Sequence, residues 1–286
     1  MKRLFCVALA LLIILLPGCE SKDDARIVAT TLPVYEFTQR LCQDTGLTVA
    51  RLIDQDISCL HDYTLTVAQM QSIESAQVTV ISGAGLEEFL HGVLNGEMID
   101  ASHSLTLMET DHDHGHDGHL HAEDPHIWLS PENAKVMAHN ISHGLTAQFP
   151  QHSALFEKNL AKLTGDLDAL QHYGERALHD LSCRELITFH DGFSYLAESF
   201  DLTILKSVEE ESGSEASASA LIELATLVDA HHLPAVFTEA NGSVAAAGVI
   251  AAETGAKVYA LDMAISGDSY FDAMYHNIDT LKEALQ

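Results

Sequence analysis

The sequence predicts an α/β protein of two lobes with mostly parallel sheets, joined by one long helix. Short apolar runs alternate with segments of helical periodicity in the first half of the chain and again after Cys183. That alternation is typical of parallel strands covered by helices. Between the halves, leucines recur at helical spacing across residues 151–181 without a proline. We therefore expect an N-terminal lobe over residues 19–150, a linking helix over 151–181 and a C-terminal lobe over 182–286.

The first half of the chain reads as four strands and four helices. Pro33 suits the first turn of a helix and Gly46 its end. The apolar run before Gly83 has the character of a buried strand, and Ser130-Pro131-Glu132 is a typical helix start. The expected strands cover residues 26–31, 47–53, 77–82 and 104–109, and the expected helices cover residues 33–45, 66–76, 86–94 and 130–149.

The second half repeats the alternation after Cys183, without an evident sequence repeat of the first half. Gly255 follows a helical segment and favours its termination. The expected strands cover residues 185–189, 202–206, 234–239 and 256–261, and the expected helices cover residues 194–200, 217–231, 243–255 and 270–285.

The N-terminus indicates export from the cytoplasm. Lys2 and Arg3 precede an apolar run over residues 4–16, which is too short for a transmembrane helix and typical of a signal peptide. The run ends in Leu-Pro-Gly-Cys, which resembles the lipidation site of bacterial lipoproteins. We expect residues 1–18 to be removed and Cys19 to carry a lipid that anchors the protein to the bacterial membrane, in the periplasm or at the cell surface. An ordinary secretory signal with an incidental cysteine is the alternative.

The charge of the chain excludes some partners. There are 14 lysines and arginines against 42 aspartates and glutamates, which gives a formal net charge of −28. Such a chain repels nucleic acid and anionic lipid surfaces, so neither is an expected partner. An acidic surface attracts cations instead, although acidity can also serve solubility alone.

A histidine-rich segment over residues 110–122 lacks periodicity and has few apolar residues, so we expect a surface loop. Its alternating imidazoles and carboxylates are suited to weak metal capture. A merely soluble polar loop is the alternative. The accessory metal ligands expected here are His112, His114, His116, His119 and His121.

Four other side chains lie at or beyond the carboxyl ends of expected strands, where open α/β sheets bind their ligands. His61 and His126 belong to the first half of the chain, and His190 and Asp262 to the second. A cleft between the lobes could therefore bring all four together. Singly, each histidine is better explained by a surface or core position, but their matching placement favours a shared site.

Three imidazoles and one carboxylate form a ligand set that suits Zn²⁺, whereas manganese and calcium favour more oxygen ligands. Glu239, at the end of the expected strand 234–239, is a second-choice carboxylate. The sequence therefore predicts a zinc site in the interlobe cleft.

Five motifs stand in order along the chain: LHDYTL, DPHIWLSP, FHDGFSYLA, VFTEANGS followed by IAAETGAKVYALD, and YFDAMYHNIDTLKEAL. Together they resemble a known family, the zinc/manganese solute-binding lipoproteins of bacterial ABC importers (cluster A-I). The resemblance runs from about residue 26 to the C-terminus. The resemblance implies two lobes joined by a rigid helix, with the metal between them held by His61, His126, His190 and Asp262. A histidine rather than a carboxylate at position 190 is similar to the zinc branch.

The expected function is that of an extracytoplasmic solute-binding protein that captures Zn²⁺ and delivers it to the membrane permease of an ABC importer. We expect a monomer without catalytic activity. Three alternatives remain at this level. They are a manganese-binding member of the same family, a zinc storage or chaperone protein whose loop is the main site, and a zinc hydrolase with an open ligand position.

Overall fold

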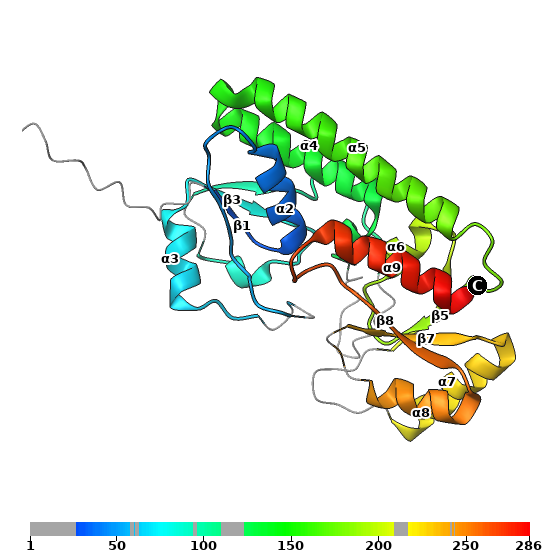
Figure 1. Cartoon of the computed structure of the whole chain (residues 1–286). Coiled ribbons are helices and arrows are strands. Elements are labelled where there is room, and N and C mark those ends of the chain that lie inside the picture. Colours follow the sequence, from blue (N-terminus) through cyan, green and yellow to red (C-terminus); the bar gives the residue numbers. More distant parts are fainter. Residues whose placement is uncertain are drawn as a thin grey trace, which may run out of the picture.

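The structure is a computed structural model that describes residues 27–57, 60, 63–93, 96–109, 123–208, 217–240, 242 and 244–286. The expected signal peptide, Cys19, His61 and the histidine-rich segment lie outside the described residues. Two lobes are visible in Figure 1, each built on one sheet. The strand orders are β2-β1-β3-β4 and β6-β5-β7-β8, and all described strand pairs are parallel. The predicted fold class is therefore confirmed.

The N-terminal lobe has short strands whose central pair is fully buried. Helices α2 and α4 pack between its sheet and the long helix α5 (Figure 1). Thr66 begins α3 with a reciprocal capping box in which Gln69 is the partner. The strands are β1 (Ile27–Ala29), β2 (Val49–Arg51), β3 (Val78–Ile81) and β4 (Glu97–Asp100), and the helices are α2 (Leu32–Leu41), α3 (Val67–Ser75) and α4 (Pro131–Gln148).

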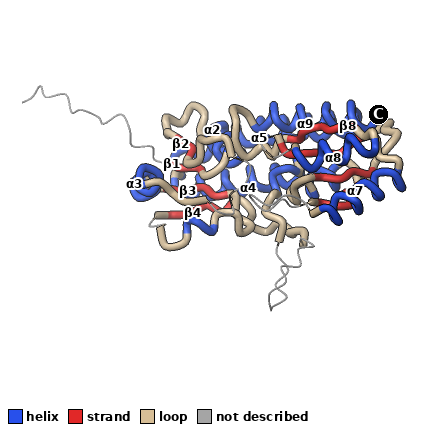
Figure 2. Tube along the Cα trace, turned by 90° about the horizontal axis from the view of Figure 1, so that it is seen from below, coloured by secondary structure: helices blue, strands red, loops and turns tan. Residues whose placement is uncertain are grey.

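The C-terminal lobe follows the expected alternation closely. Its strands are β5 (Glu185–Thr188), β6 (Thr203–Ser207), β7 (Ala235–Glu239) and β8 (Lys257–Leu261). Its helices are α6 (Ser194–Ser199), α7 (Ala218–His231), α8 (Ala245–Thr254) and α9 (Tyr270–Leu285). Viewed from below, the molecule is elongated, with the two sheets toward opposite ends (Figure 2).

Two expectations for the N-terminal lobe were wrong. The fourth strand is β4 (Glu97–Asp100) and not residues 104–109, which are largely irregular. Strand β4 escapes detection because it lies at the edge of its sheet and buries only Ile99 fully. In residues 104–109, the Met108 N–H donates to a tyrosine hydroxyl instead of joining the sheet. The segment 86–94 forms turns and a short 3₁₀ helix (Glu88–Leu90) instead of an α-helix.

The long helix is α5 (Ser153–Ala177), with 25 residues, and a 3₁₀ turn (Pro150–His152) precedes it. At about 1.5 Å per residue it extends roughly 38 Å, and it contacts both lobes. Asn159 donates from its side chain to the carbonyl oxygens of Leu41 and Gln43 in the N-terminal lobe. At the other end, Gly174 lies against the ring of Phe200, where a Cβ would come within 2.2 Å of a ring carbon.

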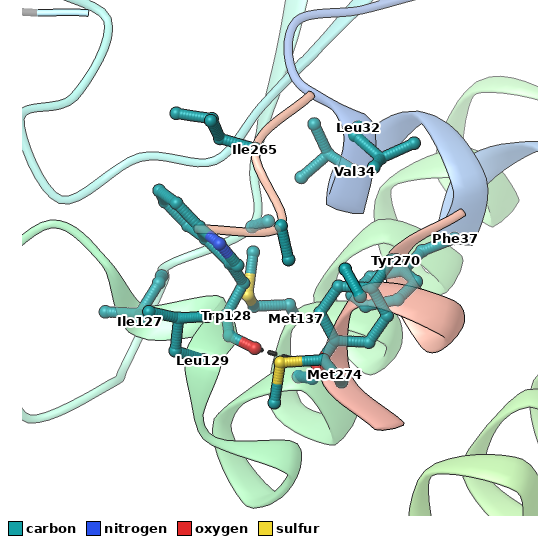
Figure 3. Close-up of a cluster of buried hydrophobic side chains, with 14 of the residues drawn as sticks. Leu32, Val34, Phe37, Ile127, Trp128, Leu129, Met137, Ile265, Tyr270 and Met274 are labelled. Atoms are coloured by element: carbon teal, nitrogen blue, oxygen red, sulfur yellow. Dashed lines mark hydrogen bonds between the residues drawn. The ribbon is translucent and has the colours of Figure 1, made fainter. Parts of the chain in front are cut away.

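An apolar cluster of buried side chains joins the two lobes (Figure 3). Trp128 is fully buried, and its Nε1–H donates to the Met263 carbonyl oxygen at 2.7 Å. The hydroxyl of Tyr270, on α9, donates to the Trp128 carbonyl oxygen at 2.8 Å. Phe37 of α2 packs edge-on against the Tyr270 ring at 5.0 Å between centroids. This cluster fixes the segment after His126 against the segment after Asp262.

Further hydrogen bonds add to this interlobe contact. The Ser266 hydroxyl accepts from Ile57 N and donates to Ile57 O, and Arg51 donates to the Gly267 carbonyl oxygen. The segment that approaches His61 is thereby held against the segment that leaves Asp262. In the described part of the chain, no helix is both long enough and apolar enough to cross a membrane.

Candidate metal centre

His126 and His190 come from different parts of the chain and meet at one point. His126 precedes a short 3₁₀ helix (Ile127–Leu129) and is 3% exposed. His190 lies two residues beyond the end of β5. Their ring centroids are 5.4 Å apart and the rings are nearly perpendicular, with an interplanar angle of 83°. Two imidazoles at this separation can serve one metal ion after small adjustments of their rings.

Asp124 sets the orientation of the His126 ring. Its Oδ1 accepts from the His126 backbone N at 2.9 Å and lies 2.8 Å from Nδ1 of the ring. Asp124 is 1% exposed. Because a carboxylate only accepts hydrogen bonds, this contact places the proton on Nδ1 and leaves the Nε2 lone pair for a metal. A carboxylate that holds a ligating imidazole from behind is a common feature of zinc sites.

Two carboxylates complete the group of titratable side chains. Glu239 ends β7, and its Oε2 lies 3.6 Å from His190 Nδ1. Burial, together with the negative charge of nearby Asp262, raises the pKa of Glu239 to about 8. A bound dication would favour the ionised form of both acids, since it offsets their mutual repulsion. A bound cation would therefore stabilise this pair of carboxylates.

Asp262 follows β8 directly and is held by Asn277 of α9. Asn277 Oδ1 accepts from Asp262 N, and its Nδ2 donates to Asp262 O, each at 2.7 Å. Asn277 is fully buried. The Asp262 carboxylate accepts from Ala264 N at 2.7 Å. The backbone N–H and carbonyl of this candidate ligand are thus both held by one side chain of α9.

The comparisons with known proteins agree with this architecture. Residues 27–284 match the sequence model of the family described as "Zinc-uptake complex component A periplasmic", ZnuA. The chain belongs to the ZnuA family. It is 30% identical over 289 residues to the "High-affinity zinc uptake system protein ZnuA" of Bacillus subtilis, with 94% of this chain and 90% of that protein covered.

Two further relatives extend the comparison. The chain is 29% identical over 307 residues to the "Zinc-binding lipoprotein AdcA" of Streptococcus pneumoniae, with 99% of this chain covered. It spans only 61% of the length of that relative. A crystal structure of ZnuA superposes with a TM-score of 0.79 at 28% identity and covers 92% of this chain and 100% of its own. Membership in the ZnuA family thus rests on nearly the whole described chain.

The structure describes only part of the predicted ligand set. His126 and His190 lie together, and Glu239 contacts His190, with Asp262 close enough to Glu239 to shift its pKa. Within the described ranges, no three histidine, cysteine, aspartate or glutamate side chains are close enough to hold a metal together. His61 and the five loop histidines fall outside those ranges. His126 follows an irregular segment instead of the strand expected at 104–109.

Three supporting residues were missed at the level of sequence. Asp124 and Asn277 hold candidate ligands through hydrogen bonds that form only in the fold, and Gly192 leaves the space beside the two imidazole rings that a Cβ would fill. For Asp124 a signal was present, since an aspartate two residues before a candidate metal-binding histidine can turn back to that ring. No comparable local signal marks Asn277, which lies 15 residues beyond Asp262.

We expect the Gly192→Ala variant to bind zinc roughly tenfold more weakly than the wild type. A Cβ at Gly192 would lie 2.9 Å from His190 Cδ2, 3.0 Å from His126 Cε1 and 2.6 Å from Met263 Cε, so both rings would have to move. Chelator competition measures the affinity. Gly248→Ala is the matched control, because a Cβ there has nothing within 4 Å. An unchanged affinity in Gly192→Ala would show that the two rings do not share the metal.

Proposed function

We propose that this chain is an extracytoplasmic solute-binding protein that binds Zn²⁺ between its lobes and delivers it to the permease of an ABC importer. The observation that carries the proposal is the meeting of His126 and His190. The proposed ligands are His61, His126, His190 and Asp262, with Glu239 as the second-choice carboxylate. The names of the relatives, a zinc uptake protein and a zinc-binding lipoprotein, support zinc as the cargo.

Zinc fits the described donors better than manganese does. Imidazole nitrogen suits zinc, while manganese favours sites rich in oxygen ligands. The contact with Asp124 occupies Nδ1 of His126 and leaves the lone pair of Nε2 as a nitrogen donor for the metal. With a carboxylate in the fourth position there is no open site for a reactive water, so the protein would bind and release its metal without catalysing a reaction.

The remaining parts of the proposal concern capture and location. The histidines of residues 110–122 would bind zinc weakly and raise its concentration near the cleft, because alternating histidines and carboxylates in a polar sequence suit metal capture without a preformed site. A lipid on Cys19 would hold the protein outside the cytoplasm and beside the permease. The protein would act as a monomer.

Metal titration of the metal-free protein tests this function. We expect one tight zinc per chain, bound at least about tenfold more tightly than manganese. Imidazole ligands bind Zn²⁺ more tightly than Mn²⁺, which prefers oxygen ligands. A chelator of known affinity sets the scale for zinc, and competition with excess Mn²⁺ measures the preference. Equal or tighter binding of manganese would contradict the proposed cargo.

A further inference from the structure

Tyr195 closes a ring of hydrogen bonds next to the candidate metal centre. Met108 N donates to the Tyr195 hydroxyl at 2.9 Å, and that hydroxyl donates to the Asp124 carbonyl oxygen at 3.0 Å. Asp124 N donates to the Met108 carbonyl oxygen at 2.8 Å, which completes the ring. Tyr195 is 2% exposed. The phenol is therefore the partner of two backbone groups from segments 87 and 71 residues away.

This ring of hydrogen bonds holds Asp124, the residue that orients the His126 imidazole. The carbonyl and N–H of Asp124 are both occupied by the ring, and its Oδ1 binds the backbone N and Nδ1 of His126. A contiguous chain of contacts thus runs from α6 through Asp124 to the imidazole. Each contact in that chain is buried, so water does not readily replace it.

The segment that leads into α6 carries His190. Tyr195 lies five residues beyond His190 on α6 (Ser194–Ser199). Phe193 packs edge-on against His190 at 6.5 Å between centroids, and Gly192 approaches both imidazole rings. Tyr195 therefore ties the His126 segment to the segment that carries the other imidazole, and it can fix the distance between the two rings.

We propose that Tyr195 is a positioning residue for metal binding, which holds His126 in register with His190 through Asp124. The inference rests on the proposed function, in which both imidazoles bind the metal. Tyr195 itself does not ligate the metal, since its hydroxyl is used by Met108 N and Asp124 O. Burial raises the pKa of Tyr195 to about 12, so the phenol keeps the proton that it donates at neutral pH.

The Tyr195→Phe variant tests this role, because it removes only the hydroxyl. We expect its zinc affinity to fall about tenfold, at the lower end of the effect of residues that orient a ligand directly. The matched control is Tyr173→Phe, which removes a hydroxyl that donates to Asp279 on α9. This control should bind zinc as the wild type does. Chelator competition measures the affinities, and denaturant unfolding of the metal-free proteins shows that each variant is folded.

A double-mutant comparison separates positioning from general destabilisation. If Tyr195 acts through His126, then Tyr195→Phe should cause no further loss of affinity in a His126→Ala background. Wild-type affinity in Tyr195→Phe would overturn the inference, and so would the same fold loss in both backgrounds. Either result leaves the proposed function intact, provided that the wild type binds one tight zinc and His126→Ala does not.

Discussion

Replacing His126 by alanine is expected to weaken zinc binding at least about 100-fold. This loss should exceed the roughly 10–100-fold effect of residues that only orient a ligand, because a metal–nitrogen bond itself is lost. His126 lies 5.4 Å from His190 between ring centroids, and Asp124 already holds its ring with the Nε2 lone pair available.

The His126→Ala affinity is best measured by chelator competition beside His139→Ala. His139 is an exposed histidine on α4, so its replacement removes an imidazole without disturbing the candidate centre. Circular dichroism checks that the variants are folded, since His126→Ala also removes a partner of buried Asp124. A His126→Ala protein that binds zinc within about threefold of the wild type would remove His126 from the ligand set.

Replacing Trp128 by alanine is expected to lower the free energy of unfolding more than any of the other substitutions. Truncation of a fully buried tryptophan costs about 3–5 kcal/mol. The Met263 carbonyl oxygen, which loses the indole N–H as its donor, adds about 1–3 kcal/mol if it remains buried and unpaired. The cluster around Trp128 joins the two lobes (Figure 3). The free energy of unfolding should therefore fall by about 4 kcal/mol or more.

Urea unfolding of the metal-free protein measures this loss without a contribution from bound zinc. Trp128→Phe is the matched variant, since it keeps an aromatic ring and removes the hydrogen bond to Met263. It should lose clearly less free energy of unfolding than Trp128→Ala. Equal stability of Trp128→Ala and the wild type would show that this interlobe cluster does not hold the fold together.

The sequence predicts most of the fold because its strands are buried and parallel. The apolar runs at 77–82 and 234–239 correspond to β3 and β7, whose residues are all buried. Strand β4 was missed because an edge strand needs only one buried residue, Ile99, and has no apolar run. The alternating leucines at 105 and 107 resemble a strand, yet both are only half-buried and pack against the core from an irregular segment.

The candidate site is predictable only in part. His190 and Asp262 follow strands that the sequence shows clearly, so their placement at one edge of a parallel sheet follows from the topology. His126 was placed after a strand that does not exist, although it does lie beside His190. The contribution of Tyr195 could not be predicted, because its hydroxyl bonds only to backbone atoms, and backbone partners leave no trace in residue identity.

We expect the tight zinc site to lie between the lobes and not in the histidine-rich segment. The most direct test is the zinc stoichiometry and zinc affinity of the protein beside a variant lacking residues 111–122. The expected result is that both proteins keep one tight zinc and that the deletion removes only weaker sites. Loss of tight binding in the deletion variant would contradict it and would place the main site in the segment that was removed.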